Sequence, residues 1–587
     1  MKTNLIMKKH LLLLVLGLII VASCKKEDPE NILPTASFSI SSSAPETEET
    51  ISFTDLSTDS DGEIESWSWD FGNGSSSTEQ NPSTIYTDPG KYTISLTVTD
   101  NRGGVGTKTQ ELDVIDGNQI PNVAFGIAAT SNIIETTDGL LYGETSTDSI
   151  FFKGMELNFT DNSSDDGTIT SYSWDFGDGT TSDATNPTHT YSEDAKTYEV
   201  TLSVTDDEGA VGTYTKKVYI AGLKWTFLTN SMETASPSVD DNGDIYIGDR
   251  AGYVYKINKD NGTAIWTFEA GERVRSSVTI SDDGQTVYVG SNAEKFYAID
   301  AATGAEKWSV DVTGQIDKSS AALDVDGNLY VGTGDGILYS FDASGNENWT
   351  FDGGHEDGGI QSSPIYYNNM VFVAIDSMVY GVNASTGEKT WGYDTNGDRY
   401  EGHFVIDDNG YLYGGSEEND ENFGYLYALN TADGSEIWQR DVPGEVRANS
   451  PILGEDGGLY ISTEDGDDQA SMAMYKLDAA SGAQLWESTP AEDDFKVGGT
   501  LGATGTIYIG SNDDHFYLVD SETGGTMLKF RYEDADHSTV PVIGTDGTVY
   551  FGNRGSFLYA LSVFDNEALP VAGWPTVGGN AKHQDRK

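Results

Sequence analysis

The chain has 587 residues, and its 95 Asp+Glu against 33 Lys+Arg give it a formal net charge of −62. This length exceeds what one hydrophobic core usually supports, so several domains are expected. So acidic a chain repels a polyanion, which excludes nucleic acid as a partner. A hydrophobic content of 37% and 67 glycines indicate a turn-rich, globular β protein.

Residues 1–23 read as an export signal. Lys8 and Lys9 precede an apolar run that ends at Ala22 and is too short to span a bilayer. The following VASC, which ends at Cys24, resembles the lipobox of bacterial lipoproteins, and this resemblance implies that Cys24 is acylated and anchors the chain to a membrane. The alternative is a chance cysteine after a signal peptide. Because Cys24 is the only cysteine, disulfides and cysteine-based zinc sites are excluded.

Residues 24–33 are expected to form a tether behind the lipidated Cys24. Its KKED sequence is similar to the surface-export signal of Bacteroidetes lipoproteins. That resemblance implies an outer-membrane protein that faces the cell exterior. A plain hydrophilic tether is the alternative.

Residues 34–116 and 121–221 align with each other. The first contains SWSWDFGNG and the second SYSWDFGDG, each followed by strands of period-2 alternation. Both resemble PKD domains, which implies two immunoglobulin-like β-sandwiches with Trp69 and Trp174 in their cores. The second copy carries an extra segment, 126–154, of unknown role.

A shorter repeat fills residues 223–574. Tryptophans recur at 225, 266, 308, 349, 391, 438 and 486, and each repeat has short strands joined by Asp/Asn-Gly turns. The second strand occurs eight times, at Tyr246, Tyr288, Tyr330, Phe372, Tyr413, Tyr460, Tyr508 and Tyr550. The pattern resembles the PQQ-like repeat family and predicts an all-β chain that ends in an eight-bladed β-propeller. Either residues 223–227 or GWPTVGGNAKHQ near the C-terminal tail, 575–587, closes the last blade.

No cofactor is expected. Quinone dehydrogenases of the PQQ-like family carry a vicinal disulfide beside the cofactor, and this propeller has no cysteine, so a PQQ-dependent dehydrogenase is disfavoured. Turns such as Asp240-Asp241-Asn242-Gly243 recur between the same two strands, as a hairpin requires, so no metal site is assigned to them. Structural calcium in these turns stays open as an alternative.

The candidate ligand site lies on the propeller face where successive blades connect, because those segments converge on the axis. Arg273 and Arg275 lie two apart on an extended segment there, so their side chains point the same way. Together with the bases and histidines of the other connections they form the predicted ligand-binding set: Arg273, Arg275, Lys318, His355, Arg399, Arg447, Lys496 and His537. The alternative is a rim in which Glu272, Asp317, Glu401, Asp493 and Asp494 pair with these bases.

A catalytic alternative rests on His403, Tyr400 and Arg399, which share one connection. A base, a proton donor and a cation are what a carbon–oxygen lyase or dehydratase needs beside a uronate carboxylate. The residue types fit, but DRYEGH is no established motif, so the balance favours a protein that is not an enzyme.

The leading functional hypothesis is a surface lipoprotein that binds an acidic polysaccharide with its propeller, with the PKD domains as spacers. The alternatives are a lyase or dehydratase on uronate-containing glycans and a non-enzymatic scaffold for envelope proteins. The expected partners are thus an anionic polysaccharide, a membrane through the lipid anchor and, for the scaffold, outer-membrane proteins.

Overall fold

The structure is a computed structural model, and it describes residues 30–563 with short gaps. The gaps are 118, 131–132, 137–138, 146–149, 233–234, 355–358, 396–399, 401, 418–422, 447–448, 464–472, 489–492, 494, 496, 532–538 and 555. The predicted signal, Cys24 and the C-terminal tail lie outside the described residues. Every element in the described part is a β-strand, which confirms the all-β class. No described helix is long and apolar enough to cross a membrane.

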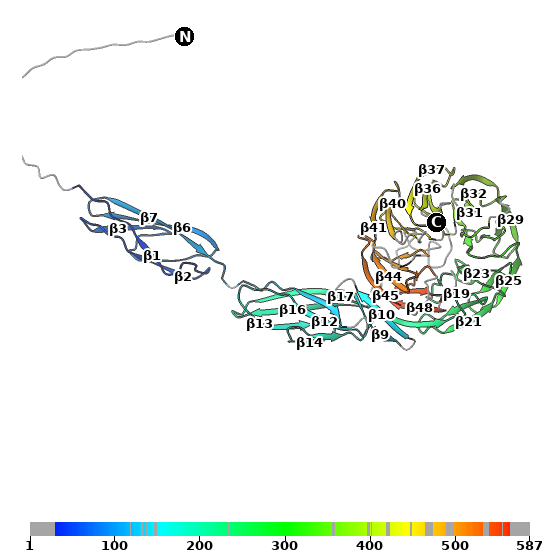
Figure 1. Cartoon of the computed structure of the whole chain (residues 1–587), viewed down its shortest axis with the longest axis horizontal. Coiled ribbons are helices and arrows are strands. Elements are labelled where there is room, and N and C mark those ends of the chain that lie inside the picture. The colour runs from blue at the N-terminus through cyan, green and yellow to red at the C-terminus, as the bar shows by residue number, and fades with distance from the viewer. Residues whose placement is uncertain are drawn as a thin grey trace, which may run out of the picture. The chain divides into compact units, whose positions relative to one another are not determined.

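Two compact units make up the chain, Met1–Ile120 and Pro121–Lys587. The first holds one PKD domain, and the second holds the other PKD domain together with the propeller (Figure 1). The second PKD domain therefore belongs to the unit of the propeller, which the sequence does not indicate.

The first PKD domain is a sandwich of two sheets. One sheet has the order β1 (Phe38–Ile40), β2 (Thr50–Asp55), β5 (Ser83–Ile85), and the other β4 (Ser76–Ser77), β3 (Ile64–Asp70), β6 (Gly90–Asp100), β7 (Val105–Val114). Along β6, Ile94, Leu96 and Val98 alternate with less buried residues and fill the core. Trp69 is fully buried among them, as predicted.

The second PKD domain repeats this plan. Its sheets have the orders β15 (Thr188–Thr190), β12 (Glu156–Asp161), β8 (Phe125–Ala129) and β14 (Thr181–Ser182), β13 (Ile169–Asp175), β16 (Lys196–Asp206), β17 (Val211–Leu228). Trp174 is fully buried and donates its indole hydrogen to the carbonyl of Ala184 at 2.9 Å. The extra segment forms β9 (Ile133–Thr136), β10 (Gly139–Thr145) and β11 (Ile150–Phe152).

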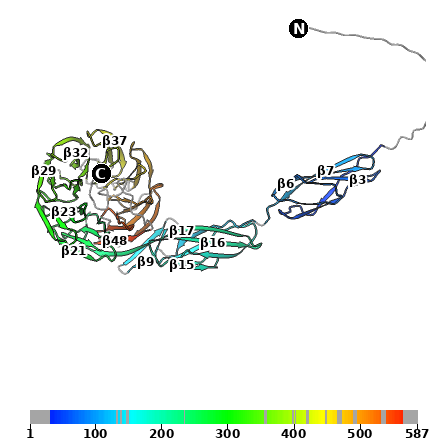
Figure 2. The ribbon, with the colours of Figure 1, turned by 180° about the vertical axis from the view of Figure 1, so that it is seen from behind.

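The propeller blades follow one another around a ring, from β19 to β48 in the colours of Figure 1, and Figure 2 shows the same ring from behind. Each blade is a meander of four antiparallel strands, in which the first is shortest. Blades 1 to 4 comprise β18 (Ser238–Val239), β19 (Ile245–Gly248), β20 (Tyr253–Ile257), β21 (Ala264–Glu269); β22 (Thr279–Ile280), β23 (Thr286–Ser291), β24 (Lys295–Asp300), β25 (Glu306–Asp311); β26 (Ala322–Leu323), β27 (Leu329–Gly332), β28 (Ile337–Phe341), β29 (Glu347–Asp352); β30 (Ile365–Tyr367), β31 (Met370–Ile375), β32 (Met378–Asn383), β33 (Lys389–Asp394).

Eight sheets of this plan can be followed in the described part of the chain. Blades 5 to 8 comprise β34 (Val405–Ile406), β35 (Tyr411–Glu417), β36 (Phe423–Asn430), β37 (Glu436–Pro443); β38 (Ile452–Leu453), β39 (Gly458–Ser462), β40 (Met474–Asp478), β41 (Gln484–Glu487); β42 (Thr500–Leu501), β43 (Thr506–Gly510), β44 (His515–Asp520), β45 (Thr526–Arg531); β46 (Val542–Ile543), β47 (Thr548–Gly552), β48 (Phe557–Ser562). The fourth strand of blade 8 is β17, which pairs with β48. Residues 223–227 thus close the last blade, one of the two closures that the sequence leaves open.

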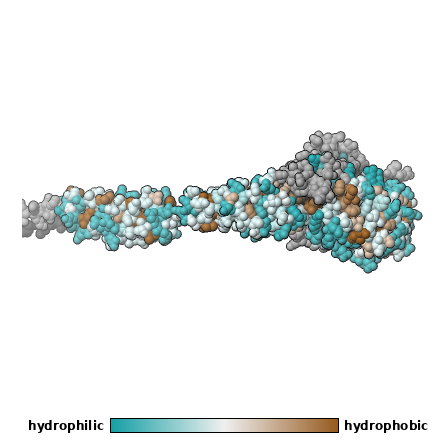
Figure 3. Space-filling model, turned by 90° about the horizontal axis from the view of Figure 1, so that it is seen from below, coloured by the Kyte–Doolittle hydropathy of each residue, from teal (hydrophilic) through white to brown (hydrophobic). Residues whose placement is uncertain are grey.

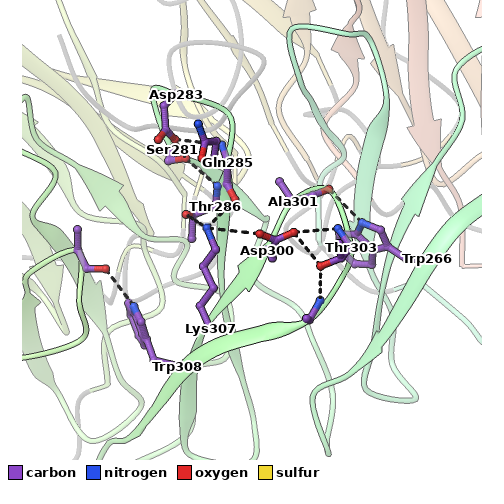
Figure 4. A network of polar contacts seen from close by, with 12 residues as sticks. Trp266, Ser281, Asp283, Gln285, Thr286, Asp300, Ala301, Thr303, Lys307 and Trp308 are labelled. Atoms are coloured by element: carbon purple, nitrogen blue, oxygen red, sulfur yellow. Dashed lines mark hydrogen bonds and ion pairs between the residues drawn. The ribbon is translucent and has the colours of Figure 1, made fainter.

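The seven recurrent tryptophans each join one blade to the next, and the outer strand of blade 7, β45, carries none. The indole of Trp266 donates to the carbonyl of Ala301 at 3.1 Å (Figure 4), and that of Trp308 to Ala343 at 3.0 Å. The same bond recurs from Trp225, Trp349, Trp391, Trp438 and Trp486. Each ring also covers a turn glycine of the next blade; a Cβ at Gly304 would lie 2.8 Å from Cδ2 of Trp266. These tryptophans are therefore scaffold residues.

Exposed hydrophobic residues are scattered among hydrophilic ones on the visible face in Figure 3. Ile265, Ile437 and Leu485 are exposed, and each directly precedes the tryptophan of an outer strand on a different blade. Such single residues are normal for a protein surface and do not mark a docking patch by themselves.

Candidate functional site

Hydrogen bonds join neighbouring blades just before the first strand of each blade, which is its inner strand. Two residues before each inner strand, one residue per blade forms a set that we call the axial ring: Ser236, Ser277, Ser320, Ser363, His403, Ser450, Gly498 and Val540. Backbone N–H groups of this ring donate to the hydroxyl of the next serine, as Ser236 does to Ser277 at 2.9 Å and Ser277 to Ser320 at 2.8 Å. Val540 donates to Ser236 at 3.0 Å, so the bonding continues from blade 8 into blade 1.

Arg275 lies two residues before Ser277 of this ring, in the connection to blade 2. Its Nη1 is 2.7 Å from Oδ2 and 2.9 Å from Oδ1 of Asp317 in the next connection. Both side chains are about four-fifths buried, with exposed fractions of 20% and 17%. The rim alternative anticipates this ion pair, and Asp317 balances the charge of Arg275.

Two amides extend the ion pair on the same face. Nδ2 of Asn292 lies 3.3 Å from Oε1 of Gln315 and 3.4 Å from Oδ1 of Asp317. Asn292 follows β23, and its backbone N–H donates to the carbonyl of Arg273 at 2.9 Å. Its Oδ1 is buried and accepts no hydrogen bond from the residues that the structure describes. Arg275, Asn292, Gln315 and Asp317 form what we call the blade 2–3 cluster.

Asn292 and Gln315 are not in the predicted ligand-binding set, which holds only charged residues and histidines. The available signal was their position, since Asn292 opens the loop between the second and third strands, which faces the same side as the blade connections. The structure places Arg273 and Lys318 in the same two blade connections as Arg275 and Asp317. The other members of the predicted ligand-binding set lie outside the described residues: His355, Arg399, Arg447, Lys496 and His537.

Tyr400 contacts the backbone of His403. The Tyr400 hydroxyl donates to the backbone carbonyl of His403 at 2.6 Å, and its side chain lies in the core beside Phe404. Burial raises the pKa of Tyr400 well above its ordinary value, which opposes a role as base at neutral pH. His403 takes a serine position of the axial ring, and its backbone N–H donates to Ser450 at 3.0 Å. Arg399, the third candidate of this set, lies outside the described residues.

In the acid–glycine turns, the example of Asp240 shows a carboxylate that is hydrogen-bonded to protein groups. Oδ1 of Asp240 accepts the backbone N–H groups of Asn242 at 2.9 Å and Asp244 at 3.0 Å, and its Oδ2 accepts from the hydroxyl of Tyr246 and from Nζ of Lys256. The contacts of Oδ1 are those of a hairpin turn, and side chains of β19 and β20 bond the second oxygen. Across the described ranges, no group of three or more His, Cys, Asp or Glu is arranged to hold a metal ion.

Comparison with protein families matches both parts of the chain. A model of the PKD domain matches residues 31–114 and 144–221. A PQQ-like repeat model, described as outer membrane protein assembly factor BamB, matches residues 250–410 and 376–494. The chain therefore carries two PKD domains and a PQQ-like repeat propeller, and this composition indicates a surface or scaffold role.

Curated relatives are similar over shorter stretches. Pre-pro-metalloprotease PrtV of Vibrio cholerae is 33% identical over 198 residues, which are 34% of this chain and 19% of that protein. Collagenase ColA of Clostridium perfringens is 33% identical over 121 residues, or 20% of this chain and 11% of the relative. The chain thus spans less than a fifth of the length of either relative.

Solved structures with similar folds cover more of the chain. BamB from Moraxella catarrhalis is 17% identical and aligns over 58% of this chain and 97% of its own, with a TM-score of 0.46. The quinohemoprotein alcohol dehydrogenase ADHIIG from Pseudomonas putida is 16% identical over 60% of this chain and 77% of its own, with a TM-score of 0.49. These identities and TM-scores say nothing about a ligand or an activity of this chain.

Proposed function

We propose that this protein is a surface lipoprotein whose propeller binds a polysaccharide on the face that carries the blade 2–3 cluster. The observation behind this proposal is the cluster itself, in which a guanidinium, a carboxylate and two amides converge from three consecutive segments of the propeller face. Sugar hydroxyls both donate and accept hydrogen bonds, so mixed donors and acceptors of this kind suit them.

The charge of the cluster bears on the kind of glycan. Because Asp317 balances Arg275, this ion pair does not attract an anion by net charge. A preference for an acidic polysaccharide therefore depends on the remaining bases of the predicted set, such as Arg399, Arg447 and Lys496. The sequence predicts these bases on the same face, and that prediction is the reason for keeping the acidic glycan as the preferred ligand.

The sequence supports the same proposal, because it predicts a location at the cell surface. A lipidated Cys24 followed by an acidic tether would hold the chain on the outer membrane, and the PKD domains would separate the propeller from that membrane. Polysaccharides at the cell exterior are then within reach of the propeller.

Affinity electrophoresis tests the proposal. The chain without residues 1–24 is run through gels that contain a neutral, a uronate-rich or a sulfated polysaccharide, beside Asn292→Ala and Lys307→Ala. Lys307 is the control, since it lies beside Asp300 (Figure 4) at the end of β24, whereas Asn292 precedes the start of that strand. Retardation that Asn292→Ala weakens and Lys307→Ala leaves intact supports the proposal, and no retardation in any gel opposes it.

A scaffold for envelope proteins is the second candidate. The observation that favours it is the match of residues 250–494 to the family model described as an outer membrane protein assembly factor. A scaffold predicts that defined outer-membrane proteins co-purify with the chain in stoichiometric amounts and that no gel retards it.

A further inference from the structure

We infer that the second PKD domain is not an independent spacer but a structural part of the propeller. The two are inferred to unfold and refold together as one cooperative unit. The first observation is the length of β17. In the first PKD domain the last strand ends at Val114, opposite Gly90. In the second, β17 passes the equivalent Ile220, opposite Lys196, and continues to Leu228.

The continuation of β17 is the outer strand of blade 8. Residues 211–220 pair with β16 of the sandwich, and residues 222–228 pair with β48 of the propeller. The order of the joint sheet is β14-β13-β16-β17-β48-β47-β46, without a linker between the domains. A strand that is hydrogen-bonded in two sheets cannot leave one of them without disturbing the other.

A second attachment comes from the extra segment. The hairpin of β9 and β10 lies between strands of the sandwich in sequence, but β10 pairs with β45, so that blade 7 becomes a six-stranded sheet. The register joins Tyr142 to Arg531 and Thr145 to Leu528. The same segment then returns as β11, which pairs in parallel with β17 at Tyr219–Ala221. The extra strands thus lie within residues 133–152, whereas residues 126–129 of the predicted segment belong to β8 of the sandwich.

The two domains also share one hydrophobic core. Phe151, Val200 and Ile220 of the sandwich belong to the same cluster of buried residues as Phe516 of blade 7 and Phe551 of blade 8. The rings of Phe516 and Phe551 stack with centroids 4.0 Å apart. Opening the sandwich would expose apolar surface of blades 7 and 8 and leave β48 as an unpaired edge.

Polar contacts also join β17 to blade 8. The hydroxyl of Ser562 donates to the carbonyl of Gly222 at 2.9 Å, and Nζ of Lys224 lies 2.6 Å from Oγ1 of Thr548 and 3.0 Å from Oδ2 of Asp546. On the far side of β17, the indole of Trp225 donates to the backbone carbonyl of Lys259 in blade 1 at 2.7 Å. One strand of the sandwich thus contacts both ends of the propeller ring.

Hydrogen exchange of the full chain with Leu202→Ala and Leu96→Ala tests this inference. The two leucines are fully buried and equivalent, since Leu202 pairs with Trp174 in the second PKD domain and Leu96 with Trp69 in the first. We expect Leu202→Ala to increase exchange of backbone amides in β47 and β48 as well as in β16, and Leu96→Ala to leave β47 and β48 unchanged. Faster exchange confined to the sandwich in Leu202→Ala would overturn the inference.

The unmodified chain provides the same test if Leu202→Ala fails to fold. With rising denaturant, the amides of β16, β47 and β48 are expected to reach one common opening free energy and one common dependence on denaturant. If β16 opens at low denaturant while β47 and β48 stay protected, the second PKD domain is an independent domain and the inference is wrong.

Discussion

The indole nitrogen of Trp225 lies 2.7 Å from the carbonyl oxygen of Lys259, and this bond ties the strand that enters from the second PKD domain to the first blade. It repeats the contact by which Trp308 joins blades 2 and 3. The place where the ring closes therefore uses the same interaction as the places where the chain is continuous.

Replacing Trp225 by Phe should destabilise the propeller about as much as replacing Trp308. Each change removes one indole hydrogen bond and leaves a small cavity, which together cost about 2 kcal/mol. Calorimetry of the propeller transition measures the effect as a lower Tm in both variants. A lower Tm in Trp308→Phe with an unchanged Tm in Trp225→Phe would show that Trp225 does not close the ring.

A comparison of two turn glycines distinguishes the cost of backbone strain from the cost of a steric clash. Gly304 and Gly284 both have positive φ, +73° and +66°, but a Cβ at Gly304 would meet the ring of Trp266 while a Cβ at Gly284 meets nothing within 4 Å. Alanine at either position should cost about 1 kcal/mol for the left-handed backbone. Gly304→Ala should cost about 1–3 kcal/mol more because the indole must move. Equal Tm values for the two variants would contradict the packing role of the tryptophan.

His515 should give blade 7 a pH-dependent stability. Burial alone would lower the pKa of His515, but contacts with Asp513 raise it above its ordinary value of 6.5; Nδ1 lies 2.7 Å from the Asp513 carbonyl. Because the folded-state pKa is the higher one, this stabilisation is complete below pH 6.5 and is lost as pH rises through the folded-state pKa. NMR titration of the imidazole should show the raised pKa, and His515→Gln should flatten the decline. A pKa below 6.5 would contradict this assignment.

Arg275 and Asp317 should be coupled in a double-mutant cycle. Each single alanine variant removes one charge of a mostly buried ion pair, which costs about 1–3 kcal/mol. The double variant should cost less than the sum of the two singles. Additive costs, measured by denaturant unfolding, would show that the pair does not interact in solution.

Repetition made most of the propeller predictable. The recurrent tryptophans, tyrosines and Asp/Asn-Gly turns specify one blade, and their spacing specifies its repetition, so the all-β class and the domain order follow from the sequence. The partner of β10 was not predictable, because a strand that pairs with blade 7 has the same local pattern as one that pairs within the sandwich. The closure by β17 was undecided for a similar reason, since either terminal strand carries a suitable pattern.

The candidate site was predictable only in part. Arg273, Arg275 and Lys318 lie in the blade connections because the alignment of inner strands fixes their positions. Whether Arg275 pairs with Asp317 depends on side-chain geometry across two connections 42 residues apart, which sequence spacing leaves open. Tyr400 looks like a polar loop residue in sequence, but folding places its ring in a core.

The binding claim is tested most directly by isothermal titration of the chain without residues 1–24 with a defined uronate-rich oligosaccharide, beside Asn292→Ala and Lys307→Ala. We predict saturable binding that weakens about 10-fold or more in Asn292→Ala, because a bound sugar hydroxyl would lose its amide partners, and that is unchanged in Lys307→Ala. Equal affinity in all three proteins would contradict a site at the blade 2–3 cluster. Absence of binding to uronate-rich, sulfated and neutral oligosaccharides alike would contradict the proposed function.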